Sequence, residues 1–320
     1  MDDVGAKGPS DESRPRVLII FPGALGDLIC FLPALRSIAR RHEGASLELM
    51  ARGELARFAV GRLGVARGHV IDRSEVSALF SESDDAETRA ASFFGGFDRV
   101  YSFFAAENSS FQRMLTMVCA GEVTFHPFRP ISFAGGDGHV ASAYLRSLGE
   151  SESIALDECR VELTTEDRDG AARALASKGL EAGKFILLVP GSGSPRKNWP
   201  AAKFAELALR LPKDCSAAIL LGPAESELES YFQGERIPML KDLELGEVAA
   251  VAQMARGFVG NDSGVSHLAA AMQAPGVVLF GPTDPARWRP LGRIMVLERT
   301  LLEDLPVADV DEALGRLLRP

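Results

Sequence analysis

The sequence contains no stretch typical of a secretory signal or of a membrane-spanning helix. Its first fifteen residues are polar and acidic and lack an apolar core, so they predict a disordered tail and neither a signal nor an anchor. No apolar run approaches the ~20 residues that cross a bilayer. We therefore expect a cytoplasmic protein, and we expect any membrane association to be peripheral.

Cysteine is scarce as well. The four cysteines stand singly along the chain, without a CxxC pair, at Cys30, Cys119, Cys159 and Cys215. Zinc sites and disulfide scaffolds require closer spacing or a higher density of cysteine. We expect neither zinc nor disulfides, and we predict reduced thiols that are mostly buried.

An excess of basic charge is also missing. The chain carries 44 acidic and 35 basic residues, which gives a formal net charge of -9. This balance argues against broad electrostatic binding to nucleic acid or to anionic lipid. Nucleic acid is therefore not an expected partner.

The sequence shows no clustered histidines, cysteines or carboxylates with the spacing of metal ligands. One segment, Asp167-Arg168-Asp169, has the DxD spacing of metal-dependent glycosyltransferases. It lies where acidic residues favour the start of a helix, so we interpret it as capping. The sequence therefore predicts neither a metal nor a cofactor.

What the sequence does contain is a regular alternation of strand and helix patterns. The apolar run Arg16 to Phe21 is typical of a strand buried on both faces, and it ends in a glycine-bearing turn. Helical spacing from Leu28 to Ile38 and a second strand at Leu47 to Ala51 complete a βαβ unit. A strand at 99–104 and helices near 111–118 and 140–148 continue the alternation, whereas residues 72–95 are ambiguous.

The same alternation starts again in the second half, after a polar stretch at residues 150–160. A helix at 166–177 precedes the buried strand Phe185 to Pro190, and a closing helix is predicted at 310–318. Further strands are predicted at 217–220, 257–260 and 276–281. The predicted organisation is a tail (1–15), an N-terminal Rossmann-like domain (16–155) and a C-terminal Rossmann-like domain (156–320).

Ligands of doubly wound sheets bind at the carboxyl ends of the strands, which draws attention to the turn from Gly23 to Asp27. Its glycines allow a close backbone approach, and Asp27 places a carboxylate at a helix start. Asp27 is either a helix cap or a functional carboxylate. The turn is not a GxGxxG fingerprint, which disfavours an NAD-dependent oxidoreductase.

A second loop, Pro190 to Pro200, follows a buried strand and suits a diphosphate. Ser192 and Ser194 can donate to phosphate oxygens, as can backbone N-H groups, while Lys197 supplies a positive charge. The alternative is a solvated surface loop with Trp199 packed on the domain.

A third loop lies in the segment Gly260 to Ala271, where Asp262, Ser263 and Gly264 precede a helix and His267 lies on its first turn. Free N-H groups at a helix N-terminus can bind an anion. Asp262 or Ser263 can equally be a simple N-cap, and a lone histidine is more often a hydrogen-bonded helix residue. The presence of two phosphate-compatible loops in one domain favours a functional role.

At these loops the chain resembles the ADP-heptose heptosyltransferases, glycosyltransferase family 9. The resemblance is carried by residues 17–40, 189–208 and 257–290, the last of which is the most specific. It implies an α/β protein of the GT-B fold, with two Rossmann-like doubly wound domains facing a cleft. The acceptor is then expected in the N-terminal domain and the nucleotide in the C-terminal domain.

The resemblance also implies roles for individual residues. Asp27 falls on the family's proposed catalytic base, and Lys197 on the diphosphate loop with Ser192, Gly193 and Ser194. Glu225 falls on the position that binds the ribose, and Leu243 on an apolar position beside the adenine. The second nucleotide-contacting loop corresponds to Asp262, Ser263, Gly264 and His267.

The implied activity is a metal-independent, inverting transfer of a sugar, with heptose expected, from an ADP-sugar. The expected acceptor is a lipopolysaccharide core or a related cell-surface glycan, lipid-linked or oligosaccharide, reached at the cytoplasmic face of the inner membrane. The alternative is a non-catalytic nucleotide-sugar-binding protein, against which the retained Asp27 argues.

The chain departs from the family pattern in two places. Pro22, Gly23 and Ala24 stand where many relatives carry hydroxyl residues. The acceptor half also lacks a basic cluster, and its candidate cations for an anionic sugar are dispersed, at Arg52, Arg57, Arg62 and Arg129.

Overall fold

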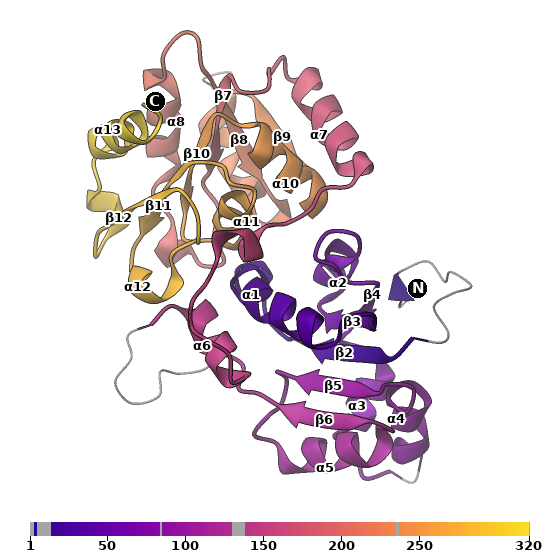
Figure 1. The fold of residues 1–320 in the computed structure, drawn as a ribbon. Helices are drawn as coiled ribbons and strands as arrows, with labels where there is room; N and C mark the ends of the chain where they lie inside the picture. The colour runs from indigo at the N-terminus through magenta and orange to yellow at the C-terminus, as the bar shows by residue number, and fades with distance from the viewer. Residues whose placement is uncertain (1–2, 5–13, 84, 130–137, 235–236, 320) are drawn as a thin grey trace. The chain divides into compact units, whose positions relative to one another are not determined.

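The computed structural model describes residues 3–4, 14–83, 85–129, 138–234 and 237–319. The chain divides into two compact units (Figure 1). The N-terminal unit comprises Met1–Gly136 and Val140–Ile154, and the C-terminal unit comprises Asp137–His139 and Ala155–Pro320. Most of the predicted tail lies outside the described residues, and Asp3–Val4 within it form a short strand, β1.

The N-terminal unit contains a six-stranded sheet in the order β1-β4-β3-β2-β5-β6. Only β1 is antiparallel to its neighbour, β4. The strands are β2 Arg16–Ile20, β3 Ser46–Ala51, β4 Arg67–Val70, β5 Arg99–Ser102 and β6 Glu122–Phe125. Because β3 and β4 extend to one side of β2 and β5 and β6 to the other, the topological switch point lies between β2 and β5.

Helices cover both faces of this sheet. The ambiguous segment 72–95 forms α3 and α4, which pack with α5 on the apolar side chains of Leu18 and Ile20. The opposite face carries α1, which contacts α6. The helices of the unit are α1 Leu25–Arg41, α2 Gly53–Ala59, α3 Ser74–Ala78, α4 Ala86–Phe94, α5 Ser109–Val118 and α6 Val140–Ser147.

The C-terminal unit has a second six-stranded sheet, in the order β12-β11-β10-β7-β8-β9, and all its strand pairs are parallel. The strands are β7 Phe185–Val189, β8 Ser216–Leu221, β9 Met239–Lys241, β10 Gly257–Asn261, β11 Gly276–Phe280 and β12 Ile294–Glu298. All residues of β7, β10 and β11 are buried, which explains their continuous apolar runs. The switch point of this sheet lies between β7 and β10.

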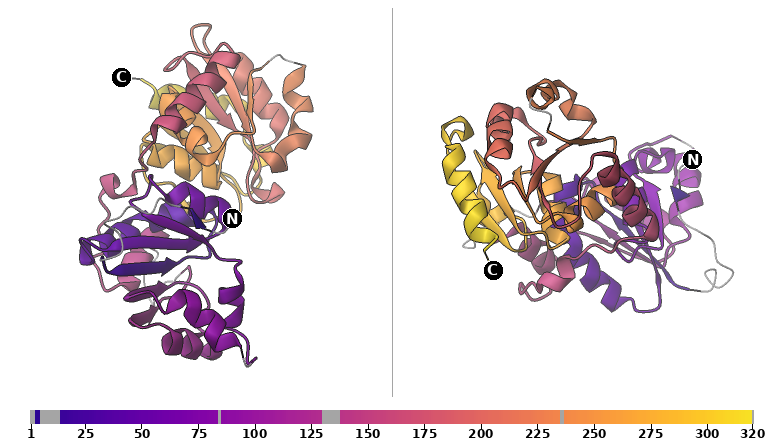
Figure 2. Two further views of the ribbon diagram at one scale, coloured as in Figure 1. Left: turned by 90° about the vertical axis from the view of Figure 1, so that its right-hand side faces the viewer. Right: turned by 90° about the horizontal axis from the view of Figure 1, so that it is seen from above.

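The helices of the C-terminal unit also form two layers. α8 packs against α13 on one face, and α10 packs against α7 and α11 on the other (Figure 2). The helices are α7 Thr165–Ser177, α8 Ala201–Arg210, α9 Ser230–Gln233, α10 Leu245–Met254, α11 Gly264–Ala271, α12 Pro285–Trp288 and α13 Val307–Leu317. Short 3-10 turns are η1 Leu156–Cys159, η2 Pro195–Lys197, η3 Pro223–Leu228 and η4 Leu302–Asp304.

The DxD-like segment belongs to the start of α7, as predicted. Asp167 is the third residue of the helix, and its carboxylate accepts a hydrogen bond of 2.9 Å from the N-H of Thr164. The N-H of Asp167 donates in turn to the hydroxyl of Thr164 at 3.2 Å. This reciprocal capping box confirms the interpretation of Asp167 as a capping residue.

All four cysteines are buried free thiols. Within the residues that the structure describes, none of the helices combines the length and the apolar character needed to cross a bilayer.

Candidate functional site

Asp27 lies on the first turn of α1, directly beyond the carboxyl end of β2. It is the third residue of the helix, and its Oδ2 accepts a hydrogen bond of 3.1 Å from the N-H of Ala24. Ala24 has no side-chain acceptor to return this bond, so Asp27 alone supplies the cap. The capping role considered for Asp27 is therefore real, and it fixes the carboxylate at the switch point of the sheet.

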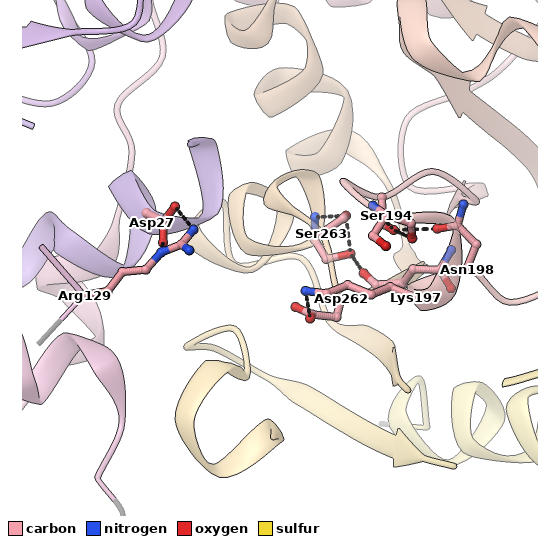
Figure 3. Close-up of polar contacts among 10 residues, drawn as sticks. Asp27, Arg129, Ser194, Lys197, Asn198, Asp262 and Ser263 are labelled. Atoms are coloured by element: carbon pink, nitrogen blue, oxygen red, sulfur yellow. Dashed lines mark hydrogen bonds and ion pairs between the residues drawn. The ribbon is translucent and has the colours of Figure 1, made fainter. Parts of the chain in front are cut away.

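The carboxylate of Asp27 also forms a two-pronged ion pair with Arg129 (Figure 3). Arg129 Nε donates to Oδ1 and Nη2 donates to Oδ2, each at 2.8 Å. The side chain of Asp27 is 4% exposed, whereas that of Arg129 is 53% exposed. The hydrogen bonds to Asp27 raise the pKa of Arg129, against the opposing effect of burial. In the sequence alone, Arg129 is only one of several dispersed cations.

Gly23 and a group of aromatic side chains shape the turn. A Cβ atom at Gly23 would lie 2.4 Å from the Phe21 ring and 2.7 Å from Asp27 Cβ, so no larger residue fits without a shift. Phe21 stacks on Phe31 with ring centroids 4.6 Å apart. Both rings also contact Tyr144, which is fully buried. Asp27 is thus held in a closely packed environment.

The hydroxyl of Tyr144 has no hydrogen-bond partner of acceptable geometry among the described residues. Burial is the main cause that raises the pKa of Tyr144, and the negative charge of Asp27 is the next. The neutral hydroxyl therefore lies within electrostatic reach of the Asp27 carboxylate.

A cavity of about 610 Å³ opens at the carboxyl edge of the same sheet. Its lining combines apolar and polar side chains: Pro22, Arg52, Ile71, Asp72, Val76, Ser77, Phe80 and Phe104. Of the dispersed arginines, Arg52 contributes to this lining. Arg57 is exposed on α2, and the guanidinium of Arg62 donates to the backbone oxygens of Phe58 and Val60.

In the C-terminal unit, the loop after β7 is held together by its own polar groups. Ser192 Oγ lies 2.8 Å from the carbonyl oxygen of Ser194 and 2.6 Å from Asn198 Oδ1. It also accepts a bond of 3.3 Å from the N-H of Ser194. Gly193, between the two serines, is exposed. The two hydroxyl residues named in the sequence are thus brought together, with Ser192 engaged inside the loop.

Lys197 reaches from this loop to the end of β10. Its ammonium donates to Asp262 Oδ2 at 2.7 Å, and the side chains of Lys197 and Asp262 are 31% and 6% exposed (Figure 3). The N-H of Asp262 donates to the carbonyl oxygen of Leu279 at 3.0 Å. The structure therefore joins the two phosphate-compatible loops through a pair of opposite charges.

Ser263 is the N-cap of α11. Its hydroxyl accepts a bond of 3.3 Å from the N-H of Ser266, and Gly264 is the first residue of the helix. His267 is buried on the first turn. The capping role considered for Ser263 is confirmed. Asp262, the partner of Lys197, directly precedes this N-cap in the sequence.

Sequence reasoning missed Asn261, which ties the loop after β7 to β10. Its side-chain amide donates to the carbonyl oxygen of Pro190 at 2.7 Å and its Oδ1 accepts from the N-H of Trp199 at 2.9 Å, so it holds both ends of the loop. Trp199 is buried, and its indole donates to the carbonyl oxygen of Leu305 at 3.0 Å. A polar asparagine at the end of a fully buried strand is the sequence feature that could have indicated this role.

Glu225 lies against the same loop from the other side. It is in η3, after β8, and its Oε2 accepts a bond of 2.8 Å from the N-H of Gly222. A Cβ at Gly191 would lie 2.4 Å from Glu225 Oε1. Gly191 is therefore the residue that gives the Glu225 carboxylate room beside the loop after β7.

Leu243 is half-buried in the loop after β9. Because β10, β7, β8 and β9 are neighbours in this order, the loops that carry Asp262, Lys197, Glu225 and Leu243 follow adjacent strands of one sheet. The predicted nucleotide residues thus gather at one sheet edge, around the switch point.

No group of three or more histidine, cysteine or carboxylate side chains is placed to hold a metal ion in the part of the chain that the structure describes. The absence of a metal requirement stays a prediction.

Comparison with known proteins gives a family match over the second half of the chain. Residues 140–305 match the model of "Glycosyltransferase family 9 (heptosyltransferase)". The chain is 34% identical over 116 residues to lipopolysaccharide heptosyltransferase 1 of Pseudomonas aeruginosa, a match that covers 35% of this chain and only 33% of that protein. It is 26% identical over 316 residues to lipopolysaccharide heptosyltransferase 1 of Escherichia coli K12, over 91% of this chain and 95% of that protein.

A solved structure shares the fold across almost the whole chain. The Escherichia coli ADP-heptose lps heptosyltransferase II superposes with a TM-score of 0.73 at 18% identity, over 95% of this chain and 98% of that one. This likeness confirms the predicted GT-B architecture of two doubly wound α/β units.

Proposed function

Because the chain belongs to glycosyltransferase family 9, the heptosyltransferases, we propose that it moves a heptose from ADP-heptose to a lipopolysaccharide core acceptor in one inverting, metal-independent step. The observation that carries this proposal is the arrangement of Asp27 and Lys197. Each lies beyond the carboxyl end of a strand at the switch point of its own sheet. The acceptor is assigned to the N-terminal unit and the nucleotide to the C-terminal unit.

For the donor, the C-terminal unit offers a distinct group for each part of ADP. The ammonium of Lys197 suits the diphosphate, and the N-H groups at the start of α11 add donors at the positive end of the helix dipole. The carboxylate of Glu225 suits the ribose hydroxyls, and the half-buried Leu243 suits the face of the adenine. The name of the Escherichia coli relative, an ADP-heptose heptosyltransferase, supports ADP-heptose as the donor.

The chemical step is a direct displacement. An acceptor hydroxyl attacks the anomeric carbon, and its proton passes to the carboxylate of Asp27. The bond between the anomeric carbon and the diphosphate oxygen breaks, and the electron pair leaves with ADP. A single displacement of this kind inverts the anomeric configuration.

Stabilising the departing ADP falls to Lys197 and to the start of α11. Negative charge builds up on the diphosphate as the bond breaks, and preorganised donors stabilise such charge by a few kcal/mol each. Lys197 is pre-positioned by Asp262, which holds its ammonium at 2.7 Å.

For the acceptor, the cavity of about 610 Å³ in the N-terminal unit is the proposed binding region. Its apolar wall suits the faces of sugar rings, and Arg52 and Asp72 offer polar contacts to their substituents. A lipid-linked acceptor would bring the protein into peripheral contact with the inner membrane.

The alternative, a non-catalytic nucleotide-sugar-binding protein, is separated from a transferase by turnover. The experiment incubates the protein with ADP-heptose and a lipopolysaccharide that lacks the added heptose, and measures ADP release and the mass of the product. We expect transfer with ADP-heptose at the same rate in the presence of a chelator. Binding of ADP without turnover would indicate the non-catalytic protein, and loss of ADP binding on chelation would contradict the metal-free mechanism.

Thermal stabilisation gives a second readout for the donor. A ligand at ~100 times its dissociation constant adds roughly 2.7 kcal/mol to the free energy of unfolding. We expect ADP and ADP-heptose to stabilise the protein, and UDP-sugars to have a much smaller effect.

A further inference from the structure

We propose that Arg129 blocks Asp27 until an anionic group of the acceptor takes the guanidinium and releases the carboxylate. The inference rests on the proposed function, in which Asp27 is the general base, and adds a specificity-determining residue. The enzyme would thereby protect its donor from hydrolysis when no acceptor is bound.

The hydrogen bonds to Asp27 show why the base is blocked. Arg129 donates to both carboxylate oxygens at 2.8 Å, and Ala24 donates to Oδ2 at 3.1 Å. An ionised carboxylate has about four acceptor positions, so these three donors leave about one position for an incoming hydroxyl. The guanidinium must therefore move away from the carboxylate before an acceptor hydroxyl can approach both of its oxygens.

The two members of the pair differ in freedom of movement. Asp27 is fixed by the helix start and is 4% exposed, whereas the side chain of Arg129 is 53% exposed. Arg129 also has a φ of +51°, in the left-handed region that non-glycine residues rarely adopt. The exposed, strained residue is the one that a ligand can approach and displace.

The chemistry of Arg129 defines what can displace it. A guanidinium presents a planar fork of donors that matches a carboxylate or a phosphate group. By moving from Asp27 to such a group, Arg129 keeps its charge-assisted hydrogen bonds. Neutral sugar hydroxyls and water carry no negative charge, so hydrogen bonds to them would not replace the ion pair with Asp27. The acceptor class is therefore a glycan with a carboxylate or phosphate near the accepting hydroxyl.

The reaction that this arrangement suppresses is donor hydrolysis. An unblocked Asp27 could take a proton from a water molecule as its oxygen bonds to the anomeric carbon. The bond to the diphosphate oxygen would break, and ADP and free heptose would be released. With Arg129 in place, the carboxylate is available only after the acceptor has bound.

The test measures ADP release from ADP-heptose without acceptor. General-base catalysis contributes typically ~10²- to 10⁴-fold, so we expect Arg129→Gln to hydrolyse the donor at least about tenfold faster than the wild type. The double variant Arg129→Gln with Asp27→Asn should fall back to the rate of Asp27→Asn alone. Arg113→Gln, which changes an exposed arginine of α5, is the matched control and should hydrolyse like the wild type.

A second arm uses transfer to a lipopolysaccharide acceptor. The wild type should lose transfer efficiency at least about tenfold when the acceptor's acidic groups are neutralised, by methyl esterification of carboxylates in one sample and by phosphatase treatment in the other. The sample that loses efficiency identifies the group. Arg129→Gln should accept native and neutralised glycans alike, and Arg129→Lys, which keeps the charge without the fork, should lie between the two.

The outcomes distinguish a failure of the inference about Arg129 from a failure of the proposed function. If Arg129→Gln and Arg129→Lys are folded, as thermal melting would show, and hydrolyse the donor at the wild-type rate, the inference is overturned. Loss of transfer in Asp27→Asn would in that case still support Asp27 as the base. Faster hydrolysis that persists in the double variant would also overturn it, because the water would then be activated elsewhere. Full transfer by Asp27→Asn would overturn the role of Asp27 as the base, and the inference with it, while failure of the wild type to transfer heptose at all would overturn the proposed function.

Discussion

The Asp27 site and the Lys197 site each consist of an ion pair, but the proposed functional group is the buried member of one pair and the more exposed member of the other. Each lies at the switch point of a parallel sheet, and each pairs one buried and one partly exposed charge. In the N-terminal unit the proposed functional group, Asp27, is the buried member behind Arg129. In the C-terminal unit the proposed functional group, Lys197, is the outer member in front of Asp262.

This difference indicates that the two sites meet their ligands in different ways. A diphosphate can contact the ammonium of Lys197 directly, with the buried Asp262 behind it as an anchor. An acceptor hydroxyl can reach Asp27 only after Arg129 has moved. Under these proposed roles, the nucleotide site is ready in the free protein and the base is not.

The largest expected effect comes from Asp27→Asn. Asparagine caps a helix about as well as aspartate, and its Oδ1 can still accept from the N-H of Ala24. Transfer should fall ~10²- to 10⁴-fold because the proton acceptor is gone, while ADP affinity stays nearly unchanged. Single-turnover transfer and calorimetry with ADP measure the two quantities. Near wild-type transfer would reduce Asp27 to a helix cap.

Lys197→Ala should have the opposite pattern. A hydrogen bond to a charged group contributes about 1.5–3 kcal/mol, so the dissociation constant of ADP should rise roughly 10- to 100-fold while that of adenosine changes little. Calorimetry with both ligands measures this.

The double variant Lys197→Ala with Asp262→Asn controls for the buried carboxylate that the single change leaves unpaired. It should restore stability without restoring ADP affinity. Equal losses for ADP and adenosine would mean that Lys197 supports the fold or the adenine pocket.

Gly191→Ala should weaken the nucleoside end of the site. Its new Cβ would lie 2.4 Å from Glu225 Oε1 and must displace that carboxylate, whereas a Cβ at Gly193 has nothing within 4 Å. Losing one hydrogen bond of about 1 kcal/mol predicts a roughly fivefold weaker binding of ADP and adenosine alike. Gly193→Ala should bind both as the wild type does. Unchanged affinity in Gly191→Ala would argue against a ribose contact by Glu225.

The smallest expected effect is that of Tyr144→Phe on stability. The buried hydroxyl has no partner of acceptable geometry among the described residues, so its removal should leave the free energy of unfolding unchanged or raise it by up to about 1 kcal/mol.

Tyr101→Phe is the matched control in a urea titration. The hydroxyl of Tyr101 lies 2.9 Å from His42 Nε2, and its loss should cost about 1 kcal/mol. A comparable loss in Tyr144→Phe would show that its hydroxyl is paired.

The fold was predictable where strands are buried on both faces. The apolar run of β7 is continuous because neither face contacts solvent. Strands β4, β6, β9 and β12 were missed, and three of them, β6, β9 and β12, lie at sheet edges. These strands are short or partly exposed, and β6 has no continuous apolar run to mark it. Residues 72–95 stayed ambiguous because α3 and α4 are too short for a strong helical period.

The candidate site was predictable only in part. Asp27 and Lys197 stand in glycine-rich loops after predicted strands, so their positions followed from the sequence. The partner of Asp27 did not, because Arg129 is 102 residues away and nothing in the local sequence of Arg129 records that contact. Asn261 was overlooked for a similar reason, since its bonds to Pro190 and Trp199 depend on the pairing of β7 with β10.

In the proposed mechanism a single displacement transfers the sugar, while Asp27 takes the proton and Lys197 holds the departing diphosphate. The anomeric configuration of the product tests it most directly. NMR of the glycan formed from ADP-heptose of known configuration measures the anomeric configuration of the new glycosidic bond. A single displacement predicts a product with the configuration opposite to that of the donor. A product that retains the donor's configuration would require two displacements, and would contradict Asp27 as the base of a one-step transfer.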